Sequence, residues 1–102
     1  MGRVRYQVEQ DIVKEIHKVT VHTFSVGDVE DPEIYAAGPI WDWQQTDAGK
    51  FIMEHAVEKP SYHQSLDYNS FGYRYAIVAE LEAKKLSEFY LRWGKNGSSK
   101  IR

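Results

Sequence analysis

The stretch that most constrains this chain is NSFGYRYAIVAEL at 69–81, because it alternates between two kinds of side chain. Large apolar groups share one parity and smaller or polar groups share the other, namely Tyr73, Tyr75 and Ile77 against Arg74, Ala76 and Val78. Successive side chains of a strand point to opposite faces of a sheet, so the alternation predicts a strand over 73–81. The preceding NSFG predicts a turn. The fold must therefore contain a sheet with tyrosine rings on one face.

Three other stretches also have strand character. IVKEIHKVTVHTFSVG at 12–27 is rich in β-branched residues and predicts a long strand over about 16–26. Both of its faces carry apolar groups, which is typical of a central strand. Residues 61–68 alternate more weakly and predict a further strand, and residues 1–11 are expected to form an arm or an extra edge strand.

The segment between the strands predicted at 12–27 and 61–68 has the spacing of apolar residues that is typical of a helix. Asp31 and Pro32 suit the cap and the first position of a helix. Gly38-Pro39 interrupts the pattern, because an interior proline removes a backbone hydrogen bond. We expect a kink there, or a second helix from the proline to about Ala56. The alternative is a break at TDAG, 46–49, with a strand over 51–56.

The end of the chain predicts a short helix over about 82–88 and a last strand over 89–93, unless the helix continues to Trp93. The order β-α-β-β-α-β indicates an α+β, ferredoxin-like two-layer sandwich, with an antiparallel sheet and helices on one face. We expect a single domain over 1–94 and a flexible polar tail over 95–102. The uncovered face of such a sheet is solvated, binds a ligand or meets another subunit.

Composition excludes several classes of protein. The chain has no cysteine, which excludes disulfide scaffolds, thiolate zinc sites and cysteine nucleophiles. It has no apolar run of roughly 18 residues and no secretory signal at MGRVRYQVEQ, so no membrane span and a cytoplasmic location are expected. Fifteen carboxylates outnumber thirteen cations, and three of these cations are Lys95, Lys100 and Arg102 in the tail. The body is therefore acidic, which lowers the expectation of nucleic-acid binding.

The aromatic strand is the first candidate site. NSFGYRYA resembles the third-strand motif of RNA-recognition domains, in which Phe71, Gly72 and Tyr73 match, but Asn69 stands where that motif has a cation. The resemblance implies stacking of single-stranded nucleic acid on Phe71, Tyr73 and Tyr75, with Arg74 on a phosphate.

Alternating rings are more often core or interface, so our first hypothesis is a non-enzymatic domain that self-associates, most simply as a homodimer. Its anchors on the open sheet face are expected to be the aromatic side chains of Tyr73, Tyr75, Phe89 and Trp93.

A pocket between helix and sheet is the third hypothesis, in which His22, His55 and Trp41 serve a small ligand-binding domain or an enzyme of dimeric ferredoxin-like type. Trp41 and Trp43 are two positions apart and cannot share a helix face, and we expect Trp41 in the core. We predict no catalytic set, metal or cofactor. The chain lacks paired helical histidines around a glutamate, and the acidic residues of GDVEDPE at 27–33 lack calcium-loop spacing.

Residues 21–56, VHTFSVGDVEDPEIYAAGPIWDWQQTDAGKFIMEHA, resemble small uncharacterised proteins encoded by large tailed phages of marine bacteria. The resemblance extends to FGYRYAIVAEL and covers roughly half of the chain. That family has no assigned activity, so the resemblance implies a small intracellular accessory protein and assigns no catalytic residue.

Overall fold

The computed structural model describes residues 3–10, 12–69 and 71–94, and these residues form two strands, two helices, two more strands and a final helix. In chain order these elements are β1 (Arg3–Glu9), β2 (Ile12–Gly27), α1 (Pro32–Gln45), α2 (Asp47–His55), β3 (Ser61–Asp67), β4 (Gly72–Glu82) and α3 (Ala83–Trp93). The strands predicted over 16–26, 61–68 and 73–81 are confirmed as β2, β3 and β4, and the N-terminal segment supplies the edge strand β1. The predicted tail over 95–102 lies outside the described residues.

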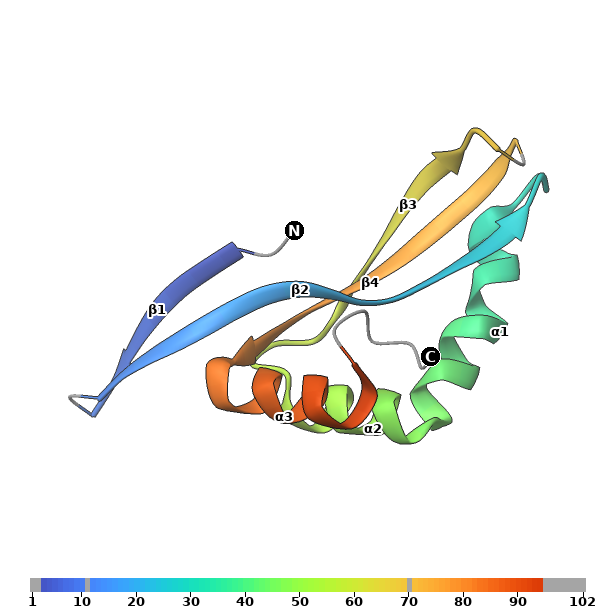
Figure 1. Ribbon diagram of the computed structural model, residues 1–102. Coiled ribbons are helices and arrows are strands. Elements are labelled where there is room, and N and C mark those ends of the chain that lie inside the picture. The colour runs from blue at the N-terminus through green and yellow to red at the C-terminus, as the bar shows by residue number, and fades with distance from the viewer. Residues whose placement is uncertain (1–2, 11, 70, 95–102) are drawn as a thin grey trace.

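The four strands form one antiparallel sheet in the order β1-β2-β4-β3 (Figure 1). Strands β2 and β3 run in the same direction with β4 between them, and the helices α1 and α2 connect them. The register of β2 against β4 shifts between Thr20 and His22, which places a bulge at Val21. A bulge increases the local twist, and the sheet curls along its length.

The α+β class and the antiparallel sheet are confirmed, but the ferredoxin-like order is not, because residues 89–93 belong to α3. Leu86, Phe89 and Trp93 recur every three or four residues and pack on the core, whereas Leu91 is exposed. This is the period of a helix rather than of a strand. The edge that a fourth β-α-β-β-α-β strand would have taken, beside β2, is occupied by β1.

Two alternatives were expected at Pro39, a kink or the start of a second helix, and the second of these is wrong. Helix α1 runs through the proline, and the chain becomes extended at Thr46. The Thr46 hydroxyl accepts a hydrogen bond from the Gly49 amide at 3.0 Å and so caps α2. A Cβ at Gly49 would lie 1.8 Å from the Trp43 carbonyl oxygen, so this tight join requires glycine. The alternative break at 46–49 had the right place, but residues 51–55 continue as helix.

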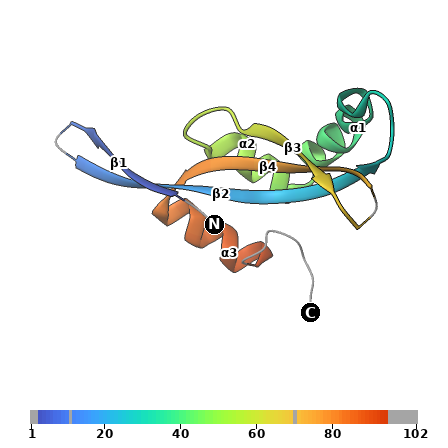
Figure 2. The same cartoon turned by 90° about the horizontal axis from the view of Figure 1, so that it is seen from above.

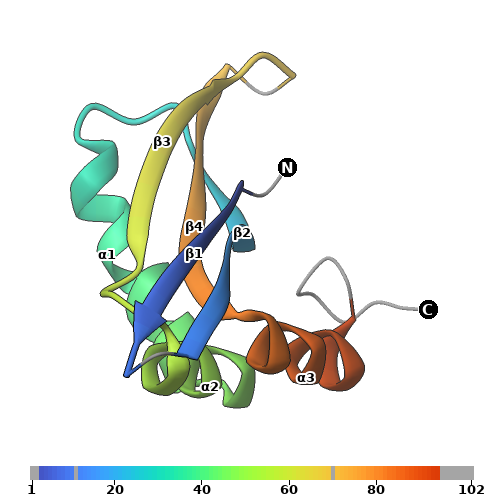
Figure 3. The ribbon, with the colours of Figure 1, turned by 90° about the vertical axis from the view of Figure 1, so that its left-hand side faces the viewer.

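The core lies between one face of β2 and β4 and the helices α2 and α3. Ile77 and Leu81 of β4 pack there with Val21, Ile52 and Phe89, all of them fully or almost fully buried. Figure 3, which looks along the molecule from its β1 end, shows α2 and α3 together below the sheet. The prediction of helices on one face is therefore correct for the pair that forms the core.

The described chain is elongated, with principal extents of 49 × 28 × 23 Å. Its long axis arises because β1 and the first part of β2 form a hairpin that extends past the helices (Figure 2). The pairing of β4 with β2 ends at Ile16 and Glu82, and α3 begins at the next residue. The hairpin beyond this point has no helix beneath it.

Candidate interaction surface

The aromatic side chains of β4 face the helices, not the open face of the sheet. Tyr75 is only 5 % exposed, and its ring stacks on Phe24 with 5.4 Å between ring centroids. Its hydroxyl donates a hydrogen bond to Gln64 of β3 at 2.9 Å, and burial raises the pKa of the Tyr75 phenol. Phe89 is buried in the core, and Trp93 packs against it with 5.4 Å between ring centroids. The expectation that Tyr75 and Phe89 anchor an interface on the open face is therefore wrong.

The three rings predicted to stack bases are not presented together. Phe71 is exposed in the β3–β4 turn at a φ of 58°, Tyr73 is half-buried, and Tyr75 is interior. Arg74 points to the opposite face of β4, where its guanidinium lies 3.8 Å from the Asp67 carboxylate. The described residues of this strand thus do not form a continuous stacking platform.

The residues predicted to line a pocket are also separated. The His22 ring stacks on Trp43 with 6.0 Å between centroids, and burial lowers the pKa of His22. His55 packs on Phe51 and borders a shallow depression between α2 and α3 that neither His22 nor Trp41 lines. Trp43 is in the core and Trp41 is exposed, so the expected roles of the two tryptophans are reversed.

The part of the chain that the structure describes contains neither a cluster of metal ligands nor a helix that could cross a membrane. No three histidine or carboxylate side chains among these residues gather as metal ligands. Likewise, none of the described helices has the length and apolar character needed to cross a membrane.

The open face of the sheet carries polar and charged side chains around Val78. Beside Val78, a depression of about 340 Å³ is lined by Arg3 and Lys18 together with Thr20 and His63. The described residues that line this depression include no phenylalanine, tyrosine or tryptophan, so it lacks the mainly apolar and aromatic walls that are typical of a small-molecule site.

Several exposed apolar side chains gather on the β1–β2 hairpin. Val4, Tyr6 and Val8 lie on one face of β1, and Val8 is opposite Val13 of β2. Tyr6 is 66 % exposed and Val8 is 68 % exposed, and the other two are also exposed. We call these four residues, Val4, Tyr6, Val8 and Val13, the hairpin patch.

The hairpin patch lies on the same face of the sheet as the core. Val4 is opposite His17, and His17 is opposite the buried Leu81 of β4. Since paired residues share a face, the patch lies on the same side of the sheet as the apolar face of β4, separated from it by the paired Glu15 and His17 of β2. It is exposed because the helical layer stops there.

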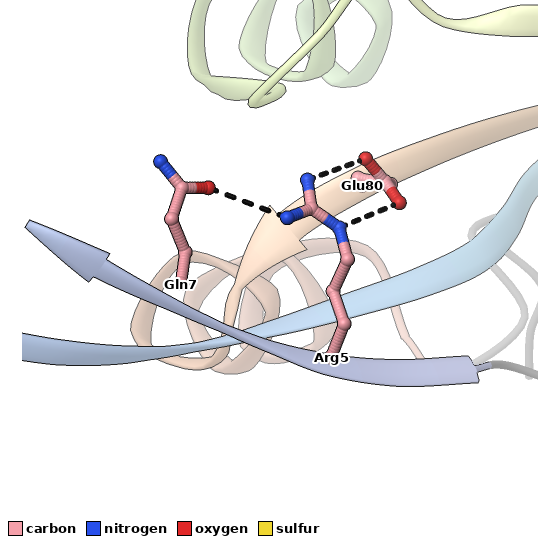
Figure 4. Close-up of polar contacts among 3 residues, drawn as sticks. All are labelled: Arg5, Gln7 and Glu80. Atoms are coloured by element: carbon pink, nitrogen blue, oxygen red, sulfur yellow. Dashed lines mark hydrogen bonds and ion pairs between the residues drawn. The ribbon is translucent and has the colours of Figure 1, made fainter.

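The opposite face of the hairpin carries charged side chains around Ile12 and Ile16, and these charges tie it to the body. The Arg5 guanidinium donates two hydrogen bonds to Glu80 of β4, at 2.9 and 3.2 Å, and a longer one to Gln7 (Figure 4). Lys14 bridges Glu9 and Glu82 at 2.9 and 3.3 Å. The Arg5 hydrogen bonds lower the pKa of the Glu80 carboxyl. These contacts link the hairpin to β4 and help to hold it in one position.

The outer edge of β1 has no strand beside it among the described residues. Proteins commonly protect such an edge with proline, lysine, a bulge or a covering loop. Arg3–Glu9 has three charged residues, but it contains neither proline nor lysine, and its pairing with β2 is regular. The alternation of RVRYQV was visible in the sequence and predicted this strand, but the absence of a covering layer was not.

Comparison of the chain with protein-family models, with curated proteins and with solved structures finds no match in any of the three. The resemblance to phage proteins therefore stays a prediction, and function has to be argued from the surfaces described above.

Proposed function

We propose that this protein is a small interaction domain that self-associates through the β1–β2 hairpin. The observation that carries the proposal is the exposed hairpin patch beside an unprotected strand edge. The proposal keeps the function expected from the sequence, a non-enzymatic self-associating domain, and moves the contact from β4 to β1.

Two physical terms favour contact at this edge. Apolar side chains that become cross-strand neighbours contribute roughly 0.2–1 kcal/mol per pair, and each chain offers several in the patch. A strand added at the free edge also pairs backbone groups that otherwise bond only to water. Neither term alone gives a stable complex, because association costs translational and rotational entropy. Together they act on the same few residues.

A second copy of the chain is a suitable partner for this edge, because a small domain gains stability from a subunit contact. A domain of this size buries a modest fraction of its surface, so subunit contacts add appreciably to its stability. The free edge of β1 also lies away from the helices, so a copy paired there would bring apolar side chains beside the hairpin patch without disturbing the helical layer.

The test is molar mass by light scattering on a sizing column across a concentration series. The intact chain should approach twice the monomer mass as concentration rises. Val8→Lys should shift it toward the monomer, since lysine places a charge in the hairpin patch.

Leu66→Lys is the matched control. Leu66 is an apolar residue, 55 % exposed, on the other edge strand, β3. This variant should assemble as the intact chain does. A monomeric intact chain at every concentration, or a Val8→Lys variant of unchanged mass, would refute self-association through the hairpin.

A further inference from the structure

We propose that two copies join by antiparallel pairing of β1 with β1, with the two-fold axis at Tyr6. This inference rests on the proposed self-association and specifies its register and its charge recognition. The resulting sheet would be continuous across both copies, in the order β3-β4-β2-β1-β1-β2-β4-β3.

The sequence of β1, RVRYQVE, is complementary to itself in this register. An antiparallel pair centred on Tyr6 sets Val4 of one copy opposite Val8 of the other, so the two hairpin patches merge on one face. On the other face Arg3 lies opposite Glu9, and Arg5 lies opposite Gln7. Because the contact is isologous, each of these pairs occurs twice.

The directions of the backbone hydrogen-bonding groups of β1 also fit a two-fold axis at Tyr6. Glu9 and Ile12 pair across a connection of two residues. In such a hairpin the closing pair exchanges hydrogen bonds, and hydrogen-bonded pairs then alternate along the ladder. The odd residues of β1 therefore direct their backbone groups to β2, and Val4, Tyr6 and Val8 direct theirs to the free edge. These residues would form the new ladder.

The cations of β1 give the register its specificity. Arg3 is opposite Lys18 of β2 on the same face and makes no ion pair with any described residue. Glu9 of the second copy would bring a carboxylate to this cationic position. That carboxylate is 54 % exposed while it bonds Lys14, so it retains free lone pairs.

Neighbouring registers are poorer. A centre at Arg5 would set the two Arg5 side chains opposite each other, and like charges directly opposite destabilise a sheet. A centre at Gln7 would pair Arg5 with Glu9 but would leave Arg3 and Val4 outside the ladder. The centre at Tyr6 is the one that pairs all seven residues of β1.

The experiment exchanges charges at the two ends of β1 and measures the dimer dissociation constant by analytical ultracentrifugation. Arg3→Glu alone makes both end pairs acidic, and Glu9→Arg alone makes both basic. Each variant should raise the dissociation constant by about tenfold, as expected for two exposed pairs turned repulsive.

An equimolar mixture of the two variants should form heterodimers with a dissociation constant within about threefold of that of the intact chain. At one end of the paired strands the introduced glutamate then lies opposite the introduced arginine. At the other end the original pair of Arg3 with Glu9 is kept. Both end pairs of the heterodimer are therefore attractive.

The outcomes separate this register from self-association in general. Rescue in the mixture supports the register. Unchanged assembly of both single variants would overturn the register and leave self-association standing. Loss with Glu9→Arg but not with Arg3→Glu would indicate the centre at Gln7, which also overturns it. A monomeric intact chain would instead refute the proposed function. Circular dichroism of each variant checks that the fold is intact.

Discussion

Strands β1 and β4 have the same kind of sequence and opposite surroundings. Each has tyrosine and other apolar residues on one parity and smaller or polar residues on the other, yet Tyr75 of β4 is 5 % exposed and Tyr6 of β1 is 66 % exposed. Strand β4 is paired on both sides and has α2 and α3 beneath it. Strand β1 is paired on one side and extends past the helices (Figure 1). Alternation therefore tells which side chains share a face, whereas the covering layer decides whether that face is core or contact surface.

Truncation in the two strands should give the largest contrast. Ile77→Ala removes a fully buried side chain from β4 and should lower the free energy of unfolding by about 2–5 kcal/mol. Val8→Ala in β1 should lower it by no more than about 0.5 kcal/mol when the protein is dilute enough to be monomeric. Urea unfolding followed by tryptophan fluorescence measures both. Similar losses for the two variants would mean that the hairpin patch is covered within the monomer.

Removing one hydroxyl from each strand gives a smaller and cleaner contrast. Tyr75→Phe deletes the hydrogen bond to Gln64 and should cost about 0.5–1.5 kcal/mol of unfolding free energy. Tyr6→Phe should leave the monomer's stability unchanged, because no described residue bonds the Tyr6 hydroxyl. The same denaturation assay compares the pair. A loss at Tyr6 equal to that at Tyr75 would contradict the difference in their environments.

Local sequence rules predicted much of the fold. The β-branched run at 12–27 and the alternation at 73–81 predicted β2 and β4, and Asp31-Pro32 predicted where α1 begins. The prediction that the tyrosines of β4 share one face of the strand and that Arg74 lies on the other was also correct. These features depend on neighbours within a few residues, which is why they could be predicted from the chain alone.

The errors came from choices that tertiary packing decides. Residues 89–93 match both a period of two and a helical period, and the contact of Phe89 and Trp93 with Phe51 of α2 favours the helix. Pro39 was given more weight than Thr46, although Thr46 has the hydroxyl that caps α2. Because residues 89–93 were predicted to be a strand beside β2, the position that β1 occupies, the exposed edge and the open face were assigned incorrectly. The rings of β4 were therefore predicted to be a surface.

The candidate surface was the least predictable part. The sequence contains RVRYQVE in full, including its self-complementary charges, but its meaning depends on β1 being an edge strand beside β2. That position is a property of the whole sheet. A short alternating N-terminal segment predicts a strand, and only the assembled sheet shows that the strand has a free side and no helix below.

The smallest expected effect is on the pH dependence of the free energy of unfolding. It compares His22, which lies under the helices, with the ion pair that holds the hairpin. His22 lies opposite Ile77 of β4 and stacks on Trp43, and burial lowers its pKa below the ordinary 6.5. The unfolded chain then binds a proton that the folded chain does not, so stability should fall as pH decreases below about 6.5 and should not depend on His22 above about 7.5. His22→Phe keeps a stacking ring without the titration and should flatten the slope between about pH 5 and 6.5, in urea unfolding midpoints measured at each pH.

A slope that survives in His22→Phe would have to come from another group. The carboxyl of Glu80 cannot supply it in that range, because Arg5 lowers its pKa below 4.5, so its contribution is complete above that value and is lost only as pH falls further. Glu80→Gln should therefore leave the slope above about pH 5 unchanged and reduce stability by at most about 1 kcal/mol, as for a partly exposed ion pair. The two variants therefore distinguish two sources of pH dependence. Near the helices, burial controls the protonation of His22. At the hairpin, the ion pair of Arg5 with Glu80 holds β1 to β4.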